Sequence, residues 1–237
     1  MTVYAFYDGV VASLHTFRAR IYCGEVGTYV WQAQSSVSAW SGLTGAVSSD
    51  GASTPAGWYG KLRKHAVDSQ QFQYDDGSWF LHVGDTGYRY VIPSEPYWQQ
   101  FIDQSVALLG TTKIRTWFAA GRFAVSSLFD SIDTQNLRLS TWQTIEARVN
   151  YALQTYPSLQ LQLIIYGEDD PTLQAAADGD VLKRYAARYA QARWSAYPNV
   201  QWCVINDRRV PAAVNVIAPI MFAEEPWGTL ITRYDIA

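Results

Sequence analysis

The sequence contains little charge. Lysine, arginine, aspartate and glutamate together make up 16% of its 237 residues, whereas about 25% is usual in soluble domains. The formal net charge is −3, and a chain with this balance lacks the basic stripe with which proteins hold nucleic-acid phosphates. We therefore expect no nucleic-acid partner.

Cysteine and histidine are scarce, and long apolar runs are missing. Cys23 and Cys203 lie in separate apolar stretches and only three histidines occur, so no metal-ligand spacing is present and we expect neither a metal nor a cofactor. No apolar run reaches about 18 residues, which predicts no membrane span. The first residues lack the charged and apolar regions of a signal peptide, which leaves the cytoplasm and a processed secreted form as alternatives.

Aromatic residues, by contrast, are abundant. The chain has ten tryptophans and sixteen tyrosines, and 49% of its residues are hydrophobic. Most such rings fill cores and favour strands. Flat rings also stack on the apolar faces of sugars, and the excess as a whole favours a carbohydrate-binding cleft.

The first 76 residues have the pattern of a small all-β domain. Apolar and polar residues alternate in the runs 16–22 and 28–33, and glycine-containing turns separate such runs. No helical period of useful length occurs in this part. Short strands with regular turns predict a β-sandwich over residues 1–76.

From residue 77 onward, strand-like and helix-like segments alternate. Repeated strand–helix–strand units predict a parallel sheet with right-handed crossovers. Five strands and four crossovers correspond to about the first half of a TIM-type (β/α)8 barrel over residues 77–237. Helices separate the expected strands, whose ranges are 79–84, 112–118, 159–166, 199–205 and 228–232.

A barrel that is only half complete would be open at its edges and along its inner face. We expect Trp117, together with Ile165 or Trp202, to lie on that inner face and to be open to water. Unpaired strand edges and exposed apolar area of this kind favour self-association.

Polar residues stand where several predicted strands end. Asp85, Glu168 and the pair Asn206–Asp207 each come directly after an apolar run. Because the carboxyl ends of barrel strands form the catalytic face, we expect Asp85, Glu168 and Asp207 to lie close together. Each has a plainer interpretation: Asp207 could cap the next helix, Glu168 could belong to a solvated acidic loop, and Asp85 could be structural.

Two residues of the second predicted barrel strand add to this candidate site. Arg115 and Trp117 share one face of the strand because side chains alternate. An arginine there can pair with a site carboxylate and lower its pKa.

Several stretches resemble the apiosidase-like glycoside hydrolases. The runs 4–9, 17–20 and 71–77 are similar to the N-terminal immunoglobulin-like domain of that family. Gly84-Asp85-Thr86 resembles a step in its first barrel strand, and Asn206-Asp207 resembles the end of its fourth.

The resemblance implies a general acid/base at Asp207 and a carbohydrate substrate. The substrate-binding residues that we predict beside it are Asp85, Arg115, Trp117, Glu168 and Asn206. In the family the nucleophilic carboxylate follows strand seven, whereas this sequence stops near strand five. Glycoside hydrolysis needs two carboxylates, so we expect a chain truncated about half-way through the barrel that hydrolyses little by itself.

Three functions follow from these patterns. The first is a glycoside hydrolase, or the N-terminal part of one, that cleaves a plant or microbial polysaccharide or oligosaccharide. The second is a carbohydrate-binding or scaffold protein that lacks the second carboxylate. In the third, two chains assemble a full barrel from halves.

Overall fold

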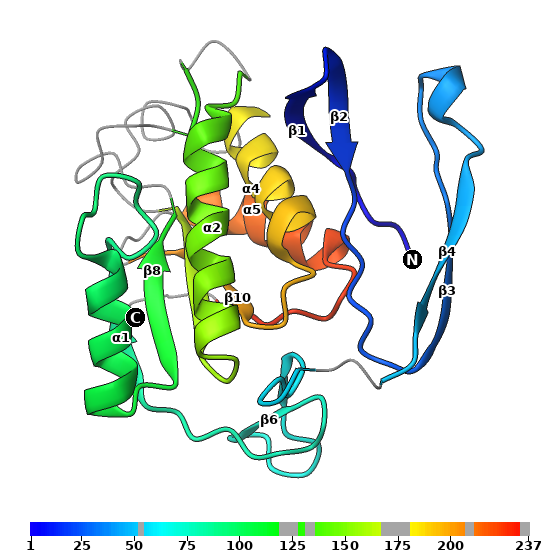
Figure 1. Ribbon diagram of the computed structural model, residues 1–237. Coiled ribbons are helices and arrows are strands. Elements are labelled where there is room, and N and C mark those ends of the chain that lie inside the picture. The colour runs from blue at the N-terminus through cyan, green and yellow to red at the C-terminus, as the bar shows by residue number, and fades with distance from the viewer. Residues whose placement is uncertain (52–54, 119–127, 131–135, 167–180, 207–210, 233–237) are drawn as a thin grey trace.

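The computed structural model describes residues 1–51, 55–118, 128–130, 136–166, 181–206 and 211–232. For residues 211–214 it describes the helix and not the side chains. Hairpins occupy the N-terminal part, and a sheet with helices packed against it occupies the rest (Figure 1).

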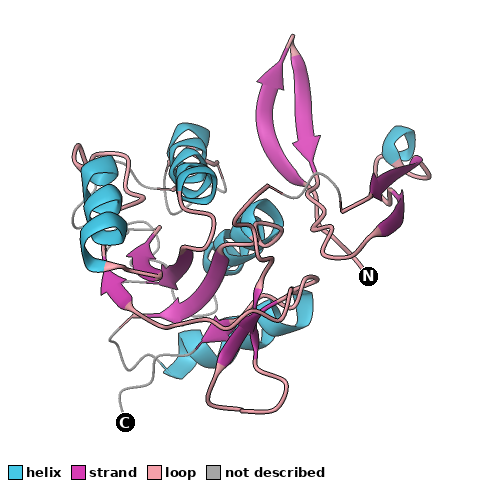
Figure 2. Cartoon of the chain, turned by 60° about the horizontal axis from the view of Figure 1, so that its bottom comes forward, coloured by secondary structure: helices cyan, strands magenta, loops and turns pink. Residues whose placement is uncertain are grey.

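The sheet of the described residues has five parallel strands in the spatial order β11-β10-β9-β8-β7. Figure 2 shows the strands of the chain in magenta and its helices in cyan. The spatial order follows the chain order, which is the winding of a barrel and not of a doubly wound sheet. The predicted parallel sheet is therefore confirmed. Its strands are β7 (Gly84–Thr86), β8 (Lys113–Trp117), β9 (Gln160–Tyr166), β10 (Val200–Ile205) and β11 (Ile231–Thr232).

In the described parts of the crossovers between these strands there are four helices. Buried side chains from all four, including Ile102, Trp142, Trp194 and Ile217, join one cluster with the sheet residue Leu163. The helices therefore cover the same face of the sheet, as they do around a barrel. They are α1 (Trp98–Leu109), α2 (Leu139–Thr155), α4 (Val181–Trp194) and α5 (Pro211–Glu224).

The first barrel strand is shorter than the sequence predicts. The expectation of a strand from Trp79 is wrong, because β7 begins at Gly84. Before it, the Thr112 hydroxyl donates to the carbonyl of Leu81 at 2.5 Å and accepts from the N–H of Val83 at 2.9 Å. The Thr112 side chain thus forms hydrogen bonds with backbone groups that would pair with β8 if the strand were longer.

The two faces of the sheet differ in polarity. On β9, Leu161, Leu163 and Ile165 pack against the helices. The side chains of Gln160 and Gln162 alternate with them and so lie on the inner face. There Gln160 accepts a hydrogen bond from Gln201 at 3.2 Å, and Gln162 donates one to Thr232 at 2.8 Å. The alternation of leucine and glutamine in the sequence encodes this division.

The expectation of an open inner face is wrong at the residues we named. Ile165 and Trp202 belong to the cluster that faces the helices. Trp117 does lie on the inner face, but only 7% of it is exposed, in a cluster with Ile164 and Cys203.

The N-terminal part is not a single sandwich in the described residues. It contains three separate antiparallel pairs, and none of its sheets exceeds two strands there. Most residues of β3 and β4 are exposed, whereas a sandwich needs one buried face on each sheet. The predicted β-sandwich is therefore not confirmed. The pairs are β1 (Phe6–Val11) with β2 (Leu14–Arg18), β3 (Gly27–Gln32) with β4 (Thr44–Ser49), and β5 (Leu62–Lys64) with β6 (Phe72–Tyr74).

The first of these hairpins packs on the helices of the sheet. Phe6 is buried in the main core with Tyr189 of α4, whose hydroxyl donates to the Tyr7 carbonyl. Asp8 forms an ion pair at 2.8 Å with Arg193, which is 1% exposed. Buried charges that lack a partner are costly, so this pairing fixes how the hairpin sits on α4.

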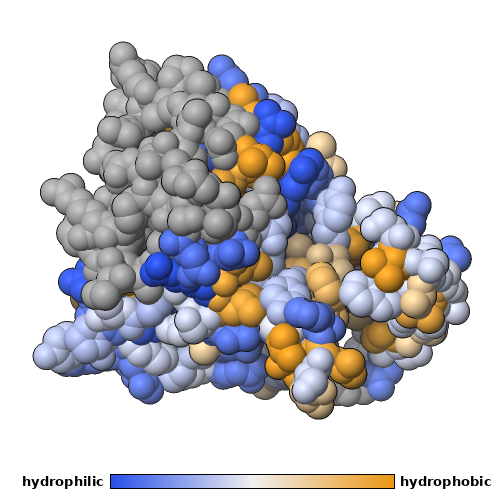
Figure 3. All heavy atoms as spheres, turned by 90° about the horizontal axis from the view of Figure 1, so that it is seen from above, coloured by the Kyte–Doolittle hydropathy of each residue, from blue (hydrophilic) through white to orange (hydrophobic). Residues whose placement is uncertain are grey.

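Apolar side chains remain on the surface of the first two hairpins. Figure 3 shows such side chains beside the hydrophilic ones on this side of the molecule. Phe17 and Trp40 are 48% and 43% exposed, and their ring centroids lie 5.1 Å apart. This ring contact links β2 to the short 3-10 helix η1 (Ser38–Trp40) between β3 and β4.

Candidate active site

The carboxyl ends of β8, β9 and β10 lie side by side at one edge of the sheet. Trp117 pairs in register with Ile164, and Ile164 pairs with Cys203. Beyond this row the chain enters segments outside the described residues, and two predicted site residues, Glu168 and Asp207, fall there. Their predicted proximity to Asp85 therefore stays untested.

Asn206 is the last described residue of the β10 segment. Its backbone N–H donates to the Tyr166 carbonyl at 3.0 Å, which extends the pairing of β10 with β9 by one step. The residue is 5% exposed, and its side-chain carbonyl oxygen has no hydrogen-bond partner in the described part of the chain. A buried amide oxygen in this state costs about 1–3 kcal/mol, and a ligand hydroxyl would relieve that cost.

A stacked aromatic pair lies at the same end of the sheet. The rings of Tyr88 and Trp117 are nearly parallel, with centroids 4.2 Å apart and an interplanar angle of 16°. Tyr88 is half-buried and follows β7 by two residues. Our sequence reasoning missed Tyr88, although an aromatic residue just beyond the first barrel strand was a visible signal.

Arg115 shares the inner face with Trp117, as alternation predicts. Its guanidinium Nη2 lies 3.8 Å from Sγ of Cys203. Lys113 lies two positions earlier on the same face. Burial lowers its pKa below the usual range, Cys203 opposes this decrease and Arg115 adds to it. The inner face of β8 therefore carries two cations below an aromatic ring.

Asp85 does not point to this site. Its register partner on β8 is Ile114, which packs against the helices. Its Oδ2 accepts from the hydroxyl of Ser105 on α1 at 3.1 Å, and its Oδ1 accepts from the N–H of Thr86 at 2.7 Å. The structure thus supports the structural interpretation of Asp85. The sequence misled us because Asp85 lies inside β7, where alternation turns it toward the helices, and not after the strand.

The segment between β7 and α1 is held by one arginine. Arg148 of α2 is 5% exposed, and its guanidinium stacks at 4.9 Å on the ring of Trp98. Burial lowers its pKa to about 10, against the opposite influence of Tyr90 and Glu95. Its guanidinium donates to four backbone carbonyls of the segment, those of Tyr90, Ile92, Pro93 and Glu95.

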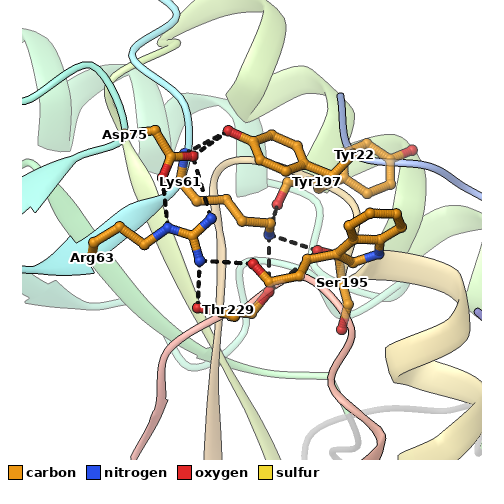
Figure 4. A network of polar contacts seen from close by, with 9 residues as sticks. Tyr22, Lys61, Arg63, Asp75, Ser195, Tyr197 and Thr229 are labelled. Atoms are coloured by element: carbon orange, nitrogen blue, oxygen red, sulfur yellow. Dashed lines mark hydrogen bonds and ion pairs between the residues drawn. The ribbon is translucent and has the colours of Figure 1, made fainter. Parts of the chain in front are cut away.

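A second polar network lies at the opposite, amino-terminal end of the sheet (Figure 4). Lys61 is 1% exposed, and its ammonium donates to the carbonyls of Ser195 and Tyr197 and to the hydroxyl of Thr229, at 2.6, 2.9 and 2.9 Å. Burial lowers the pKa of Lys61 to about 7, partly offset by Glu225. Sequence analysis did not single this lysine out.

The same network includes an ion pair within the β5–β6 hairpin. Arg63 pairs with Asp75 at 2.6 Å and also donates to the carbonyls of Trp227 and Gly228, so the hairpin is tied to the segment before β11. Burial alone would raise the pKa of Asp75, but hydrogen bonds from Arg63, Tyr22 and the Lys61 N–H together lower it. Because this network lies far along the strands from the row at Trp117, we assign it to stability.

The described part of the chain contains neither a metal-ligand cluster nor a membrane-spanning helix. Histidine, cysteine, aspartate and glutamate side chains nowhere gather there in threes as a metal site would require. Among its helices, none combines the length and apolar character needed to cross a lipid bilayer.

No family model matches the sequence, and no curated protein matches it. Solved structures do match. A candidate glycoside hydrolase from Bacteroides vulgatus ATCC 8482 superimposes with a TM-score of 0.79 at 18% identity, over 99% of this chain and 49% of its own. This chain is thus similar in fold to a protein about twice as long.

Two further solved structures agree with this match. A family 5 glycoside hydrolase from Bacteroides vulgatus ATCC 8482 gives a TM-score of 0.60 at 14% identity, over 74% of this chain and 39% of its own. Another glycoside hydrolase gives a TM-score of 0.58 at 16% identity, over 74% of this chain and 41% of its own. The chain therefore shares its fold with part of each of these glycoside hydrolases, and it spans less than half of the length of each.

Proposed function

We propose that this chain forms part of a glycoside hydrolase of the apiosidase-like kind that cleaves a plant or microbial polysaccharide or oligosaccharide. Asp207 is its general acid, and Arg115, Trp117, Glu168 and Asn206 contribute to substrate binding. The observation that carries this proposal is the end of β10, where buried Asn206, with an unsatisfied amide oxygen, immediately precedes an aspartate. The fold shared with glycoside hydrolases is consistent with it.

The chemistry assigned to Asp207 is proton transfer to the glycosidic oxygen as the bond to the anomeric carbon breaks. A second carboxylate must then attack that carbon directly or activate a water molecule, and their separation decides which: about 5–5.5 Å for retention and about 6.5–9.5 Å for inversion. Asn206 is suited to accept a hydrogen bond from a sugar hydroxyl, because its amide oxygen has no other described partner. We propose no step through a metal or cofactor.

The test is hydrolysis of aryl glycosides by an intact relative of this chain and by its Asp207→Asn variant. The substitution should lower kcat by about 10²–10⁴-fold for substrates whose leaving group must be protonated. Nitrophenolate leaves without protonation, so nitrophenyl glycosides should lose much less. An equal loss on both substrate types would show that Asp207 is structural.

A carbohydrate-binding protein without hydrolysis is the second candidate. It is favoured by the stacked Tyr88–Trp117 pair at the carboxyl end of the sheet, because aromatic rings can hold a sugar without taking part in proton transfer. Tight oligosaccharide binding with no turnover on any aryl glycoside would support this function over the first.

Two parts of the proposal concern organisation. We propose that residues 1–76 are related to an immunoglobulin-like domain, because the described strands there pair antiparallel as in such domains, although these pairs do not form a sandwich. The boundary near residue 76 stays a prediction. We also propose self-association through β7, which pairs with β8 on one side and with no other described strand. Leu108 and Leu109 at the end of neighbouring α1 are 76% and 67% exposed, and exposed apolar area of this kind favours a partner.

A further inference from the structure

The aromatic pair at the carboxyl end of the sheet is unequal in its exposure. Trp117 is only 7% exposed and has one ring face covered by Tyr88. Tyr88 is half-buried, and Trp117 covers one face of its ring. A sugar that approaches this end of the sheet therefore meets Tyr88 before Trp117.

The position of Tyr88 is fixed by its backbone as well as by its ring. Its carbonyl accepts from the N–H of Trp117 and from the hydroxyl of Thr116, both at 3.3 Å. One residue earlier, the N–H of Gly87 donates to the Arg115 carbonyl at 3.0 Å. The segment after β7 thus continues to follow β8, and the ring has little freedom to turn away.

Arg148 holds the remainder of this segment. Its guanidinium donates to four carbonyls between Tyr90 and Glu95, and the Tyr90 hydroxyl returns a hydrogen bond to the Arg148 carbonyl at 2.7 Å. A loop whose carbonyls are satisfied by a buried cation keeps one conformation, because releasing it would leave both partners unpaired. The loop is therefore suited to be a rigid wall of a binding site.

We propose that Tyr88 is the ring on which the substrate sugar stacks, and that Arg148 is the residue that positions it. The ligand is a furanose or pyranose ring that lays its apolar C–H face on the face of the Tyr88 ring that Trp117 does not cover. Trp117 supports Tyr88 from below, and its contribution to substrate binding is made through this ring contact. This inference rests on the proposed carbohydrate function and goes beyond it by assigning the contact residue and its support.

The test measures binding in the Asp207→Asn background, so that no substrate is consumed. The probes are soluble hexasaccharides of xylan, arabinan, mannan and cellulose, titrated by isothermal calorimetry. Tyr88→Leu keeps the apolar volume but removes the flat face, and it should weaken binding about tenfold or more, which corresponds to about 1.4 kcal/mol. Tyr88→Phe keeps the face and should bind within about threefold of the parent.

The matched control is Tyr97→Leu, because Tyr97 lies just before α1 and is 69% exposed. It should leave binding unchanged. Arg148→Met should weaken binding. It should also remove the near-ultraviolet circular dichroism band of the Tyr88–Trp117 stack, which is identified as the band that Tyr88→Leu removes. Arg148→Lys should restore part of both. Thermal unfolding of each variant establishes that it is folded.

The outcomes separate the inference from the function. If a hexasaccharide binds the parent, Tyr88→Leu loses it and Tyr88→Phe keeps it, the assignment stands. If Tyr88→Leu binds as tightly as the parent, the assignment is wrong while the carbohydrate function holds. Equal dichroism in Arg148→Met and the parent removes the positioning role. If none of the four probes binds the parent, the proposed function fails and the inference falls with it.

Discussion

Lys61 offers the sharpest test of how the N-terminal part is attached to the sheet. Its side chain is 1% exposed at the amino-terminal end of the sheet, and burial lowers its pKa from 10.5 to about 7. That difference corresponds to about 5 kcal/mol of unfavourable free energy for the charged form, at about 1.36 kcal/mol for each tenfold change. The sign follows directly from burial, which disfavours the charged form.

The sign fixes how stability depends on pH. Between about pH 7 and pH 10.5 the unfolded chain keeps the proton on Lys61 whereas the folded chain has lost it. The free energy of unfolding must therefore rise with pH in this window. Integrated from pH 7 to pH 9, the gain from this one group is about 2 kcal/mol.

The perturbation is Lys61→Met, which keeps an unbranched side chain and removes the titrating group. The assay is urea unfolding followed by tryptophan fluorescence at pH 7, 8 and 9. From pH 7 to pH 9, the free energy of unfolding of the wild type should rise by about 2 kcal/mol more than that of the variant. Because every other titrating group is common to both proteins, the difference isolates Lys61.

Lys64→Met is the matched control, since Lys64 is exposed and lies three residues after Lys61, at the end of β5. It should show the pH dependence of wild type. Parallel pH profiles for wild type and Lys61→Met would refute the reasoning, because they would mean that Lys61 is not buried in solution. In that case the β5–β6 hairpin would not be seated on the amino-terminal end of the sheet.

The remaining predictions concern the core, the buried ion pair and the open edge. Trp142→Ala removes a side chain that is fully buried and bonded to the Leu128 carbonyl, and it should lower the free energy of unfolding by about 3–5 kcal/mol in urea titrations. Glu146→Gln removes a partner of buried Arg193 and should cost about 3–5 kcal/mol by the same assay; a loss below about 1 kcal/mol would place the pair in solvent. Leu108→Lys with Leu109→Lys should shift the protein toward monomer in sedimentation velocity, and an unchanged distribution would exclude this edge from self-association.

The barrel-like half of the fold could be predicted because its signals are local. The leucine–glutamine alternation of β9 indicates which side chains face the helices, and the structure puts Leu161 and Leu163 there. Gly110, at the end of α1, adopts the left-handed conformation, with φ of 64°, that glycine allows at this position.

The N-terminal part could not be predicted in the same way. Alternation indicated strands, and strands are present, but it does not specify which of them share a sheet. The candidate site was only partly predictable for the same reason. Arg115 and Trp117 do share a face, whereas Asp85 turns to Ser105 on α1 because of where β7 begins.

The sequence by itself determined the succession of strands and helices, the parallel sheet and the alternation of side chains between the two faces of β9. These follow from the periods of about 2 and 3.6 residues, which neighbouring residues set among themselves. Only the tertiary structure decided that Tyr88 stacks on Trp117 and that Arg148 holds the loop between them and α1. It also brought Lys61 to carbonyls 134 and 136 positions away in the chain. Contacts over such distances depend on how elements pack, and packing is a property of the whole chain that no local pattern encodes.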